Sequence, residues 1–266
     1  MRCLITGANG VFGYHIAQGM AHAGFETHLV VRDLEKGRTL ISRLVAAGVS
    51  EDLLTLHVVD LHCSKSIEKL ASNFSSEKPI DVLINNAAAT SPQRVEVQGG
   101  VEMQWSANVL SYHRMTRAFL PHLLASKASP ARCIFVASNY AGGLNVKDPE
   151  FKARAYDGDA AYRASKQANR MLARSWADKA PAEKLCVFSC HPGVATSAVS
   201  LGLGFDLDRS THAAKAGSVT PLFLALTPIA QLANGCYYSD SKIKGCAFCE
   251  DDPLRRELWG LVESYA

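Results

Sequence analysis

Tyr162 and Lys166 stand four residues apart in the stretch 161–166. On a helix this spacing leaves the two side chains about 40° apart around the axis, so both point the same way. An ammonium group held near a phenol favours the phenolate and lowers its pKa, which is normally about 10. Such a tyrosine can give and take a proton near neutral pH. Because the pattern also occurs by chance on surface helices, the rest of the chain must decide.

A glycine-rich turn follows the first strand-like run, Arg2 to Thr6. Glycines let the backbone approach a pyrophosphate, which then rests against the positive end of the next helix. The spacing of Ile16, Met20 and Ala23 predicts that helix, so the turn has the context of a phosphate cradle rather than of an ordinary tight turn. The predicted cradle consists of Thr6, Gly7, Asn9, Gly10, Val11, Phe12 and Gly13.

The end of the second strand-like run indicates which nicotinamide cofactor the cradle serves. NAD-binding folds usually place an acid there to hold the ribose hydroxyls, and Val31 occupies that position. Arg32 follows it, and a guanidinium can grip a 2′-phosphate through two hydrogen bonds. We therefore expect NADP(H), with NAD(H) possible and a plain surface charge as the alternative for Arg32.

Short apolar runs alternate with helical patterns along the chain. This alternation predicts one α/β domain over residues 1–266, a doubly wound parallel sheet of about seven strands with helices on both faces. The expected strands cover 2–6, 28–32, 53–59, 80–85, 132–137, 185–190 and 236–239, and a last helix runs from 254 to about 264.

Composition limits the remaining possibilities. The chain has 266 residues, 48% of them hydrophobic, and a net charge of +3 without a Lys/Arg block, which disfavours a nucleic-acid partner. The fold starts at the first residues, so we expect no leader and no membrane anchor, and a cytoplasmic protein. The longest late apolar stretch, Val219 to Ala233, is broken by two prolines and is too short to span a bilayer.

Eight cysteines are scattered over the length, which predicts free thiols in a reducing compartment. Cys246 and Cys249 form one Cys-x-x-Cys pair. A zinc site would need a second pair or nearby histidines, so no metal is expected. A redox role would usually stand beside an early βαβ unit, so we do not assign one from the sequence.

With these motifs in order, the sequence resembles the short-chain dehydrogenase/reductase family, which implies a Rossmann fold. The resemblance to the family covers almost the whole chain. Within the family, the local sequence is most similar to the branch of retinol dehydrogenases and WW-domain oxidoreductases. Val11 and Ala88 stand where the family usually has glycine. The matching residues are Asp60 and Leu61 after the third strand; Asn86, Ala87 and Ala88 after the fourth; Asn108 in a helix beginning near Trp105; Ser138 closing the fifth strand; Tyr162 and Lys166; and Pro192, Gly193, Val194 and Thr196 after the sixth.

The resemblance implies an oxidoreductase in which hydride transfer is coupled to movement of one proton. It makes Tyr162 the proton donor or acceptor and Lys166 its electrostatic partner, which also holds the cofactor ribose. Ser138 would donate a hydrogen bond to the substrate oxygen, and Asn108 would support a water linked to Lys166. Ser165 is expected to be a helix-packing residue.

The expected substrate is a small alcohol, aldehyde or ketone. The stretch 197–218 contains apolar residues among glycines and would form a lid that favours a lipophilic molecule. Two alternatives stay open: a cofactor-binding sensor or scaffold without turnover, and a sugar-nucleotide epimerase, which would need a larger C-terminal part. A homo-oligomer through the helices carrying Asn108 and Tyr162 is expected from the family habit alone.

Overall fold

The computed structural model describes residues 1–75, 77–128, 130–205 and 215–265. Among these residues an eight-stranded sheet has the order β10-β9-β8-β7-β4-β1-β2-β3, and every neighbouring pair is parallel except β9 and β10. The α/β Rossmann-type fold is therefore confirmed. The strands are β1 (Arg2–Thr6), β2 (Glu26–Val31), β3 (Leu54–Val58), β4 (Val82–Asn85), β7 (Ala131–Val136), β8 (Leu185–Cys190), β9 (Tyr237–Ser239) and β10 (Lys242–Lys244).

Seven of these strands correspond to the seven expected runs: β1 and β8 have the expected bounds, and the ends of the others are shifted by at most two residues. The eighth, β10, adds an antiparallel edge to the sheet and was not expected. Its three residues are all exposed, so it carries no apolar run that a sequence pattern could reveal.

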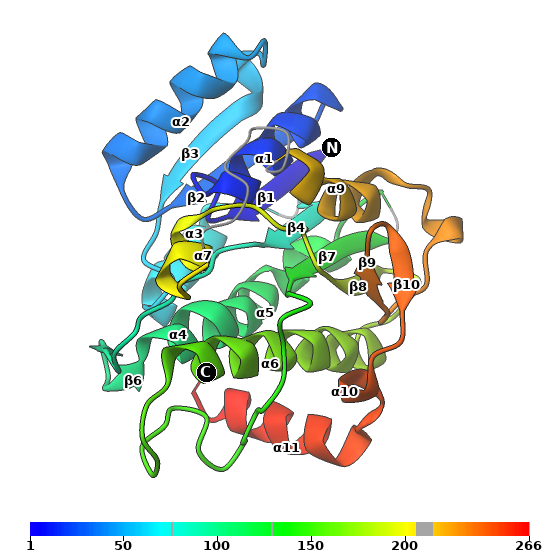
Figure 1. Cartoon of the computed structure of the whole chain (residues 1–266). Coiled ribbons are helices and arrows are strands. Elements are labelled where there is room, and N and C mark those ends of the chain that lie inside the picture. Colours follow the sequence, from blue (N-terminus) through cyan, green and yellow to red (C-terminus); the bar gives the residue numbers. More distant parts are fainter. Residues whose placement is uncertain (76, 129, 206–214, 266) are drawn as a thin grey trace.

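Alternate residues of the strands serve two cores, one on each face of the sheet. In β1, Leu4 belongs to one core, and Cys3 and Ile5 belong to the other. Figure 1 shows the helices in two layers on either side of the strands. One layer contains α1 (Val11–His22), α2 (Leu34–Ala46) and α9 (Val219–Leu226); the other contains α3 (Ser64–Ser72), α4 (Met103–Trp105), α5 (Ser111–Leu124) and α6 (Gly158–Lys179).

The strand order creates the place for a ligand. The chain builds outward from β1 to β2 and β3, then returns to place β4 on the other side of β1. The loops that leave β1 and β4 therefore run in opposite directions and open a crevice between their carboxyl ends. Both the glycine-rich turn after Thr6 and the stretch after Asn85 lie at this crevice.

Helices α4 and α5 are continuous through a π-helical segment, Ser106–Leu110, in which all five side chains are buried. Asn108 lies in the middle of this segment, within the helix predicted to begin near Trp105. Such a segment widens one turn of a helix and often occurs where a side chain must be presented to a functional site.

Helix α6 is the longest in the described part of the chain and carries the predicted pair. Asp157 caps its start, because the carboxylate accepts from the backbone N–H groups of Asp159 and Ala160 at 2.9 and 3.1 Å. Tyr162, Lys166 and Arg170 follow at intervals of four residues, so they form one row along the buried side of the helix.

Helix α11 (Asp252–Glu263) lies across the outer side of α6 (Figure 1). It starts two residues before the predicted position, since Asp251 caps it by accepting from the N–H of Leu254. The Trp259 ring stacks edge-on against those of Trp176 and His113, with centroids 5.0 and 5.1 Å apart. The outer side of α5 and α6 is therefore covered by the chain itself, so a homo-oligomer could use this side only by contacting α11.

Candidate active site

A cavity of ≈ 780 Å³ runs along the carboxyl ends of the strands. This size is typical of sites for cofactors and small molecules. Of the residues that the sequence predicts for the site, Thr6, Asn108 and Thr196 are not among those lining it. The predicted residues that line it are Gly7, Asn9, Gly10, Val11, Phe12, Gly13, Arg32, Asp60, Leu61, Asn86, Ala87, Ala88, Ser138, Tyr162, Lys166, Pro192, Gly193 and Val194.

The glycine-rich turn is shaped by close backbone approaches. Gly7 has a positive φ of 63°, and a Cβ placed on it would lie 2.7 Å from the Cα of Ala87. A Cβ on Gly13 would lie 2.2 Å from the carbonyl oxygen of Gly7. Neither position accepts a side chain, because the opposing atoms belong to the backbone. The turn thus presents bare backbone at the start of α1, which suits a phosphate group.

Thr6 and Asn86 hold this turn from beneath. The Thr6 hydroxyl accepts from the N–H groups of Asn86 and Ala87 at 2.9 and 3.1 Å. The Asn86 amide donates to the carbonyls of Thr6 and Gly7 at 3.0 and 3.1 Å. The ends of β1 and β4 are thereby tied together, and Thr6 serves the site from behind its wall.

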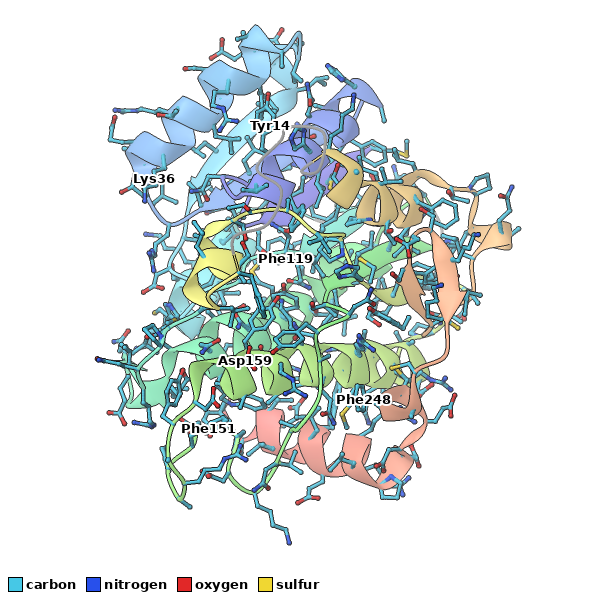
Figure 2. All side chains as sticks on the ribbon, viewed as in Figure 1. Tyr14, Lys36, Phe119, Phe151, Asp159 and Phe248 are labelled. Carbon is cyan, nitrogen blue, oxygen red and sulfur yellow. The ribbon has the colours of Figure 1, made fainter. Side chains whose placement is uncertain are left out.

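The end of β2 presents positive charge to the cavity. Arg32 and Lys36 line it, and neither side chain makes a hydrogen bond or ion pair with another described residue. Asp33 also lines the cavity, and one oxygen of its carboxylate caps α2 by accepting from the N–H of Lys36 at 2.8 Å. Figure 2 labels Lys36 on the first turns of α2, beside the crevice.

Asp60 and Leu61 line the cavity after β3. The Asp60 carboxylate accepts from the N–H of His62 at 2.9 Å and lies at the surface. His62, which the sequence did not single out, also lines the cavity, and its Nδ1 lies 2.9 Å from the Ser106 hydroxyl.

Tyr162, Ser138 and Lys166 meet at the floor of the cavity. The Lys166 ammonium is buried and donates to the carbonyl of Val136 at 3.0 Å, two residues before Ser138. It lies 5.7 Å from the centre of the Tyr162 ring and 5.4 Å from that of Tyr112. The Ser138 hydroxyl accepts from the N–H of Tyr140 at 3.0 Å, which fixes its rotamer.

The pKa of Tyr162 differs from the sequence-based expectation. Burial raises the pKa of Tyr162 to about 12, and the hydrogen bond with Ser138 lowers it only in part. Burial lowers the pKa of Lys166 to about 7, and the effect of Cys190 opposes that shift. The expected lowering of the tyrosine pKa by the lysine is therefore not found: desolvation of the phenol dominates, and only Ser138 opposes it. Near pH 7 the phenol keeps its proton.

Asn108 stands behind the tyrosine. Its Oδ1 accepts from the N–H of Ala89 at 2.8 Å, and its Nδ2 donates to the carbonyl of Ala89 at 3.0 Å and to the Ser165 hydroxyl at 3.1 Å. The Ser165 hydroxyl in turn donates to the carbonyl of Tyr162 at 2.7 Å. Ser165, expected to be a packing residue, thus connects Asn108 to the backbone of Tyr162.

The turn after β8 closes one wall of the cavity. Gly193 has a positive φ of 113°, and a Cβ on it would lie 2.5 Å from the Cα of Gly217. A Cβ on Gly217 would in turn lie 2.2 Å from the Phe12 ring. The turn at 192–194 therefore packs closely against the segment that starts α9, and this segment packs against the glycine-rich turn. The sequence did not single out Gly217, because its contact with Phe12 joins residues 205 positions apart.

Apolar side chains gather at the opposite end of the cavity. Tyr140, Val199, Leu203 and Phe205 line it, and the rings of Tyr140 and Phe205 meet edge-on with centroids 5.7 Å apart. The Tyr140 hydroxyl donates to Asp159 at 2.8 Å, near the start of α6 (Figure 2). Only part of the predicted lid at 197–218 can be described, including α7 (Ala198–Gly202), because 206–214 lie outside the described residues.

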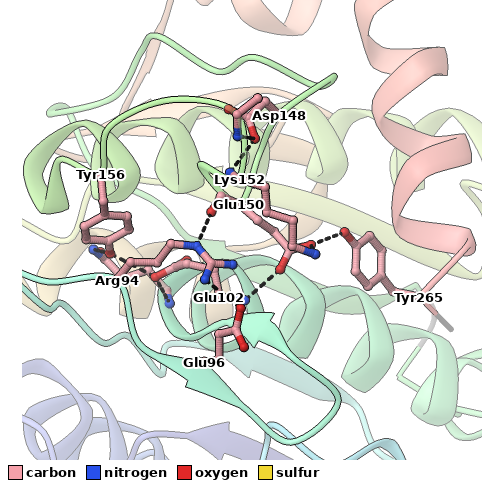
Figure 3. A network of polar contacts seen from close by, with 10 residues as sticks. Arg94, Glu96, Glu102, Asp148, Glu150, Lys152, Tyr156 and Tyr265 are labelled. Atoms are coloured by element: carbon pink, nitrogen blue, oxygen red, sulfur yellow. Dashed lines mark hydrogen bonds and ion pairs between the residues drawn. The ribbon is translucent and has the colours of Figure 1, made fainter.

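A buried polar network supports the site from the side away from the cofactor crevice (Figure 3). The Glu102 carboxylate caps α4 by accepting from the N–H of Trp105 at 2.6 Å, and it accepts from the Tyr156 hydroxyl at 2.9 Å. The Glu150 carboxylate accepts from the N–H of Glu102 at 2.7 Å and from the Tyr265 hydroxyl at 2.6 Å. The network thus joins the helix bearing Asn108 to the segment before α6 and to the C-terminal residues. No local sequence pattern reveals this network, because its partners come from three distant segments.

Comparisons with known proteins agree with this geometry. The short chain dehydrogenase family matches residues 2–202. The chain is 34% identical over 250 residues to dehydrogenase/reductase SDR family member 12 of Bos taurus, covering 90% of this chain and 76% of that protein. It is 30% identical over 280 residues to human retinol dehydrogenase 13, covering 96% and 81%.

Two solved structures show the same fold. A protein of Mycobacterium paratuberculosis superposes with a TM-score of 0.79 at 23% identity, covering 99% of this chain and 92% of that one. The NADPH-bound carbonyl reductase from chicken fatty liver gives a TM-score of 0.68 at 18% identity, covering 92% and 98%.

The chain therefore belongs to the short-chain dehydrogenase/reductase family. It is an oxidoreductase of this class, acting on CH–OH groups with NAD(P). The expected likeness to the retinol-dehydrogenase branch is confirmed by the curated relatives. Among the described residues, no helix is long and apolar enough to cross a membrane.

Proposed function

We propose that the protein interconverts a lipophilic alcohol and its carbonyl compound with NADP(H), using Tyr162 as the proton donor and acceptor. The observation that carries the proposal is the shared cavity: the glycine-rich turn, the paired cations Arg32 and Lys36, and the group formed by Ser138, Tyr162 and Lys166 all border one space.

The chain has the groups needed to hold the cofactor. The bare backbone at Gly7 and Gly13 would accept the pyrophosphate, and Arg32 with Lys36 would accept the 2′-phosphate. Asp33 lies between these two cations at the cavity wall, with one carboxylate oxygen held by the cap of α2. When bound, the nicotinamide supplies or accepts the hydride.

Tyr162 would manage the proton. Because the pKa of Tyr162 is raised to about 12, the phenol is protonated at neutral pH and ready to donate to an oxygen that gains negative charge during reduction. Oxidation needs the phenolate, and a charged Lys166 beside it would stabilise that form. The lysine would hold the cofactor ribose as well, according to the family pattern.

Ser138 and Asn108 would position the reacting groups. The Ser138 hydroxyl accepts from the N–H of Tyr140 and directs its own hydrogen toward the Tyr162 hydroxyl, so it would donate to a substrate oxygen bound beside that hydroxyl. The side-chain amide of Asn108 is occupied by hydrogen bonds to Ala89 and Ser165. It would therefore act by fixing the backbone of the cavity wall and of Tyr162. The family pattern also implies that Asn108 supports a water linked to Lys166 in a proton relay, and we propose this as a second role of the residue. Asp60, Leu61, Asn86 to Ala88, Pro192, Gly193, Val194 and Thr196 complete the proposed cofactor contacts.

A lipophilic substrate is proposed from the opposite end of the cavity. Tyr140 and Phe205 leave about two fifths of their surface exposed, 39% and 41%, although both are large aromatic residues. Apolar surface of this kind beside the proposed proton donor would gain from covering an aliphatic or aromatic substrate.

Location and assembly are also proposals. All eight cysteines are unpaired in the structure, which supports a reducing compartment such as the cytoplasm. Residues 1–266 are proposed to act as a single cofactor-binding unit. If copies associate, we expect a surface other than the side of α6 that α11 covers.

A two-part experiment tests the proposal. Binding of NADPH and NADH to the purified protein is measured by quenching of nicotinamide fluorescence, and then aldehydes, ketones and alcohols are screened for turnover. We expect tight binding of NADPH and faster turnover as the hydrocarbon part of the substrate grows. Binding without turnover of any compound would favour a sensor or scaffold, and lack of binding would contradict the proposal altogether.

A further inference from the structure

Two thiols outside the cavity lie unusually close together. The Sγ of Cys249 donates to the Sγ of Cys246 at 2.9 Å, and both residues are buried, with 5% and 7% of their surface exposed. Cys246 lies at the N-cap of the short helix α10 (Ala247–Glu250) and Cys249 within it, between the sheet edge and α11 (Figure 1). In the sequence this Cys-x-x-Cys lacked the usual setting of a redox pair, whereas the structure adds the contact between the sulfurs.

Arg170 lies beside this pair and has no counter-ion among the described residues. Its guanidinium is buried, lies 3.7 Å from the centre of the Tyr237 ring, and has Nε without a hydrogen-bond partner. No carboxylate forms an ion pair with it in the described part of the chain. A buried cation without a partner is strongly unfavourable, so a negative group is needed nearby.

The Cys246 sulfur can be that group. The hydrogen bond from Cys249 lowers the pKa of Cys246 to about 6, burial opposes the shift, and Arg170 adds to the lowering. The same hydrogen bond and burial raise the pKa of Cys249 far above its ordinary value. The contact between the sulfurs at 2.9 Å and the nearby guanidinium therefore favour the thiolate at Cys246 over the thiolate at Cys249, as for a nucleophilic and a resolving cysteine.

Arg170 connects this pair to the proposed active site. Its Nη2 donates to the carbonyl of Ser138 and, at 3.1 Å, to the Tyr237 hydroxyl. Its own carbonyl accepts from the Cys249 thiol at 3.6 Å. Phe248, labelled on α10 in Figure 2, lies on the same side, with its ring centre 5.8 Å from the guanidinium.

We propose that Cys246 and Cys249 form a redox-active dithiol, and that its oxidation to a disulfide loosens the hold of Arg170 on Ser138 and slows turnover. The effect on turnover rests on the proposed function of Ser138, whereas formation of the disulfide does not.

The reaction balances with a low-molecular-weight disulfide as oxidant. The Cys246 thiolate attacks one sulfur of that disulfide, a mixed disulfide forms, and one thiolate leaves. The Cys249 thiol then loses its proton and attacks the Cys246 sulfur, which releases the second thiolate. The Cys246 thiolate and the Cys249 thiol together lose two electrons and one proton. The small disulfide gains the two electrons and leaves as two thiolates, one of which takes up the proton from Cys249 and the other a proton from water. The two sulfurs need to approach by about 0.9 Å to reach disulfide bonding distance.

Access and charge agree with this reaction. Gly245 precedes Cys246 with open space around its Cα, and β10 before it is exposed. Cys246 itself is only 7% exposed, so we expect a small oxidant to reach it when this exposed edge of the sheet opens locally. Once the disulfide forms, the thiolate charge is lost and Arg170 stays buried without a counter-ion. We expect its contact with Ser138 to weaken as a result.

The first test measures the disulfide itself. The full-length protein is equilibrated in mixtures of reduced and oxidised glutathione, alkylated and digested with trypsin. Cleavage at Lys244 and Arg255 gives one peptide that contains Cys246 and Cys249 and no other cysteine. We expect this peptide to lose two hydrogens and to resist alkylation in oxidising mixtures, and the change to reverse with dithiothreitol. A peptide that stays alkylated while cysteines elsewhere are oxidised would overturn the proposal.

The second test links the disulfide to the site. We expect kcat/KM to fall by about tenfold along the same glutathione titration, as for loss of one charge-assisted hydrogen bond. Backbone amide exchange of the segment 137–141 should become faster in parallel, a readout that needs no turnover. A disulfide that changes neither exchange nor kcat/KM would overturn the proposal. Absence of turnover in the reduced protein would instead contradict the proposed function, while peptide masses and exchange would still test the switch.

Three variants sharpen the test. Cys249→Ser keeps a hydroxyl donor to Cys246, so it should keep near-normal reduced activity and trap a mixed disulfide with glutathione on Cys246. Cys246→Ser removes the thiolate and should match the oxidised protein before any oxidant is added. Cys236→Ser, a partly exposed cysteine elsewhere, is the control and should behave as wild type throughout. Equal reduced activity of Cys246→Ser and wild type would contradict the role of the thiolate.

Discussion

Asn108 and Ala89 are joined by two hydrogen bonds that run in opposite directions. The Ala89 N–H donates to Asn108 Oδ1 at 2.8 Å, and Asn108 Nδ2 donates to the Ala89 carbonyl at 3.0 Å. The side-chain amide thereby pairs with the backbone as a neighbouring β-strand would. The loop after β4, which lines the cavity, is locked to the π-helical segment, and through Ser165 to the backbone of Tyr162.

Replacing this amide should cost both stability and activity. Asn108→Ala would remove the partner of the partly buried N–H and C=O of Ala89, which costs at most about 1–3 kcal/mol for each group because the cavity beside Ala89 admits water. We expect a lower free energy of unfolding, measured in urea, and a lower kcat. Ser165→Ala removes only the third partner and is the matched control, with a smaller loss of stability. Equal unfolding curves for Asn108→Ala and wild type would contradict this role.

The proton-transfer role of Tyr162 can be separated from its packing. Tyr162→Phe removes one hydroxyl from a residue that is 8% exposed, so the melting temperature should change little. Loss of a general acid typically lowers kcat by about 10²- to 10⁴-fold. Tyr14→Phe, on the outer side of α1, is the control, and its kinetics should match wild type. Wild-type turnover in Tyr162→Phe would refute the assignment.

The two directions of the reaction should depend differently on pH. With the pKa of Tyr162 raised to about 12 and that of Lys166 lowered to about 7, neither group changes charge between about pH 8 and 10, so the rate of carbonyl reduction should be constant over that range. Alcohol oxidation requires the phenolate, so its kcat/KM should rise with pH, by up to about tenfold per unit. Both profiles follow from initial rates across a set of buffers. An oxidation rate that falls with increasing pH would contradict the scheme.

The sequence predicted the parts of the fold and site that depend on local pattern. Residue spacing or hydrophobic periodicity in the sequence is enough to locate the glycine-rich cradle, the run Tyr162 to Lys166 and seven of the strands. Asp33 illustrates the limit, because its role as a helix cap or as a ligand of ribose depends on the geometry at the end of β2. The pKa of Tyr162 shows the same limit, since spacing reveals a nearby lysine but not how completely the phenol is buried.

The supporting contacts could not be predicted because their partners are distant in sequence. Arg170 meets Ser138 and Tyr237 across separations of 32 and 67 residues. Glu150 meets Tyr265 across 115 residues. None of these three contacts follows from a sequence pattern, because each depends on how helices and loops pack around the sheet.

Buried histidines should make the protein less stable in mild acid. Burial lowers the pKa values of His28 and His113 to about 4, from 6.5. Between pH 6.5 and 4 both histidines are protonated in the unfolded chain and neutral in the native one. The free energy of unfolding therefore falls as the pH falls through this range, by about 1.4 kcal/mol per pH unit for each histidine. Urea unfolding at several pH values measures this slope. His113→Phe should reduce it and the surface change His22→Gln should not; an unchanged slope in His113→Phe would contradict the assignment.

The cofactor preference should depend on the free cations at the end of β2. Arg32 and Lys36 face the cavity without ion pairs to other described residues, so they can bind a 2′-phosphate without breaking an existing contact. Hydrogen bonds to charged groups contribute about 1.5–3 kcal/mol, so Arg32→Ala should weaken NADPH binding by about 10- to 100-fold while NADH binding changes little. Arg38→Ala, on the exposed side of α2 beside Glu35, is the matched control and should leave both constants unchanged. Fluorescence titrations give the two dissociation constants for each variant. If Arg32→Ala weakened NADH and NADPH equally, the arginine would serve the shared part of the cofactor, and the preference for NADP(H) would need another source.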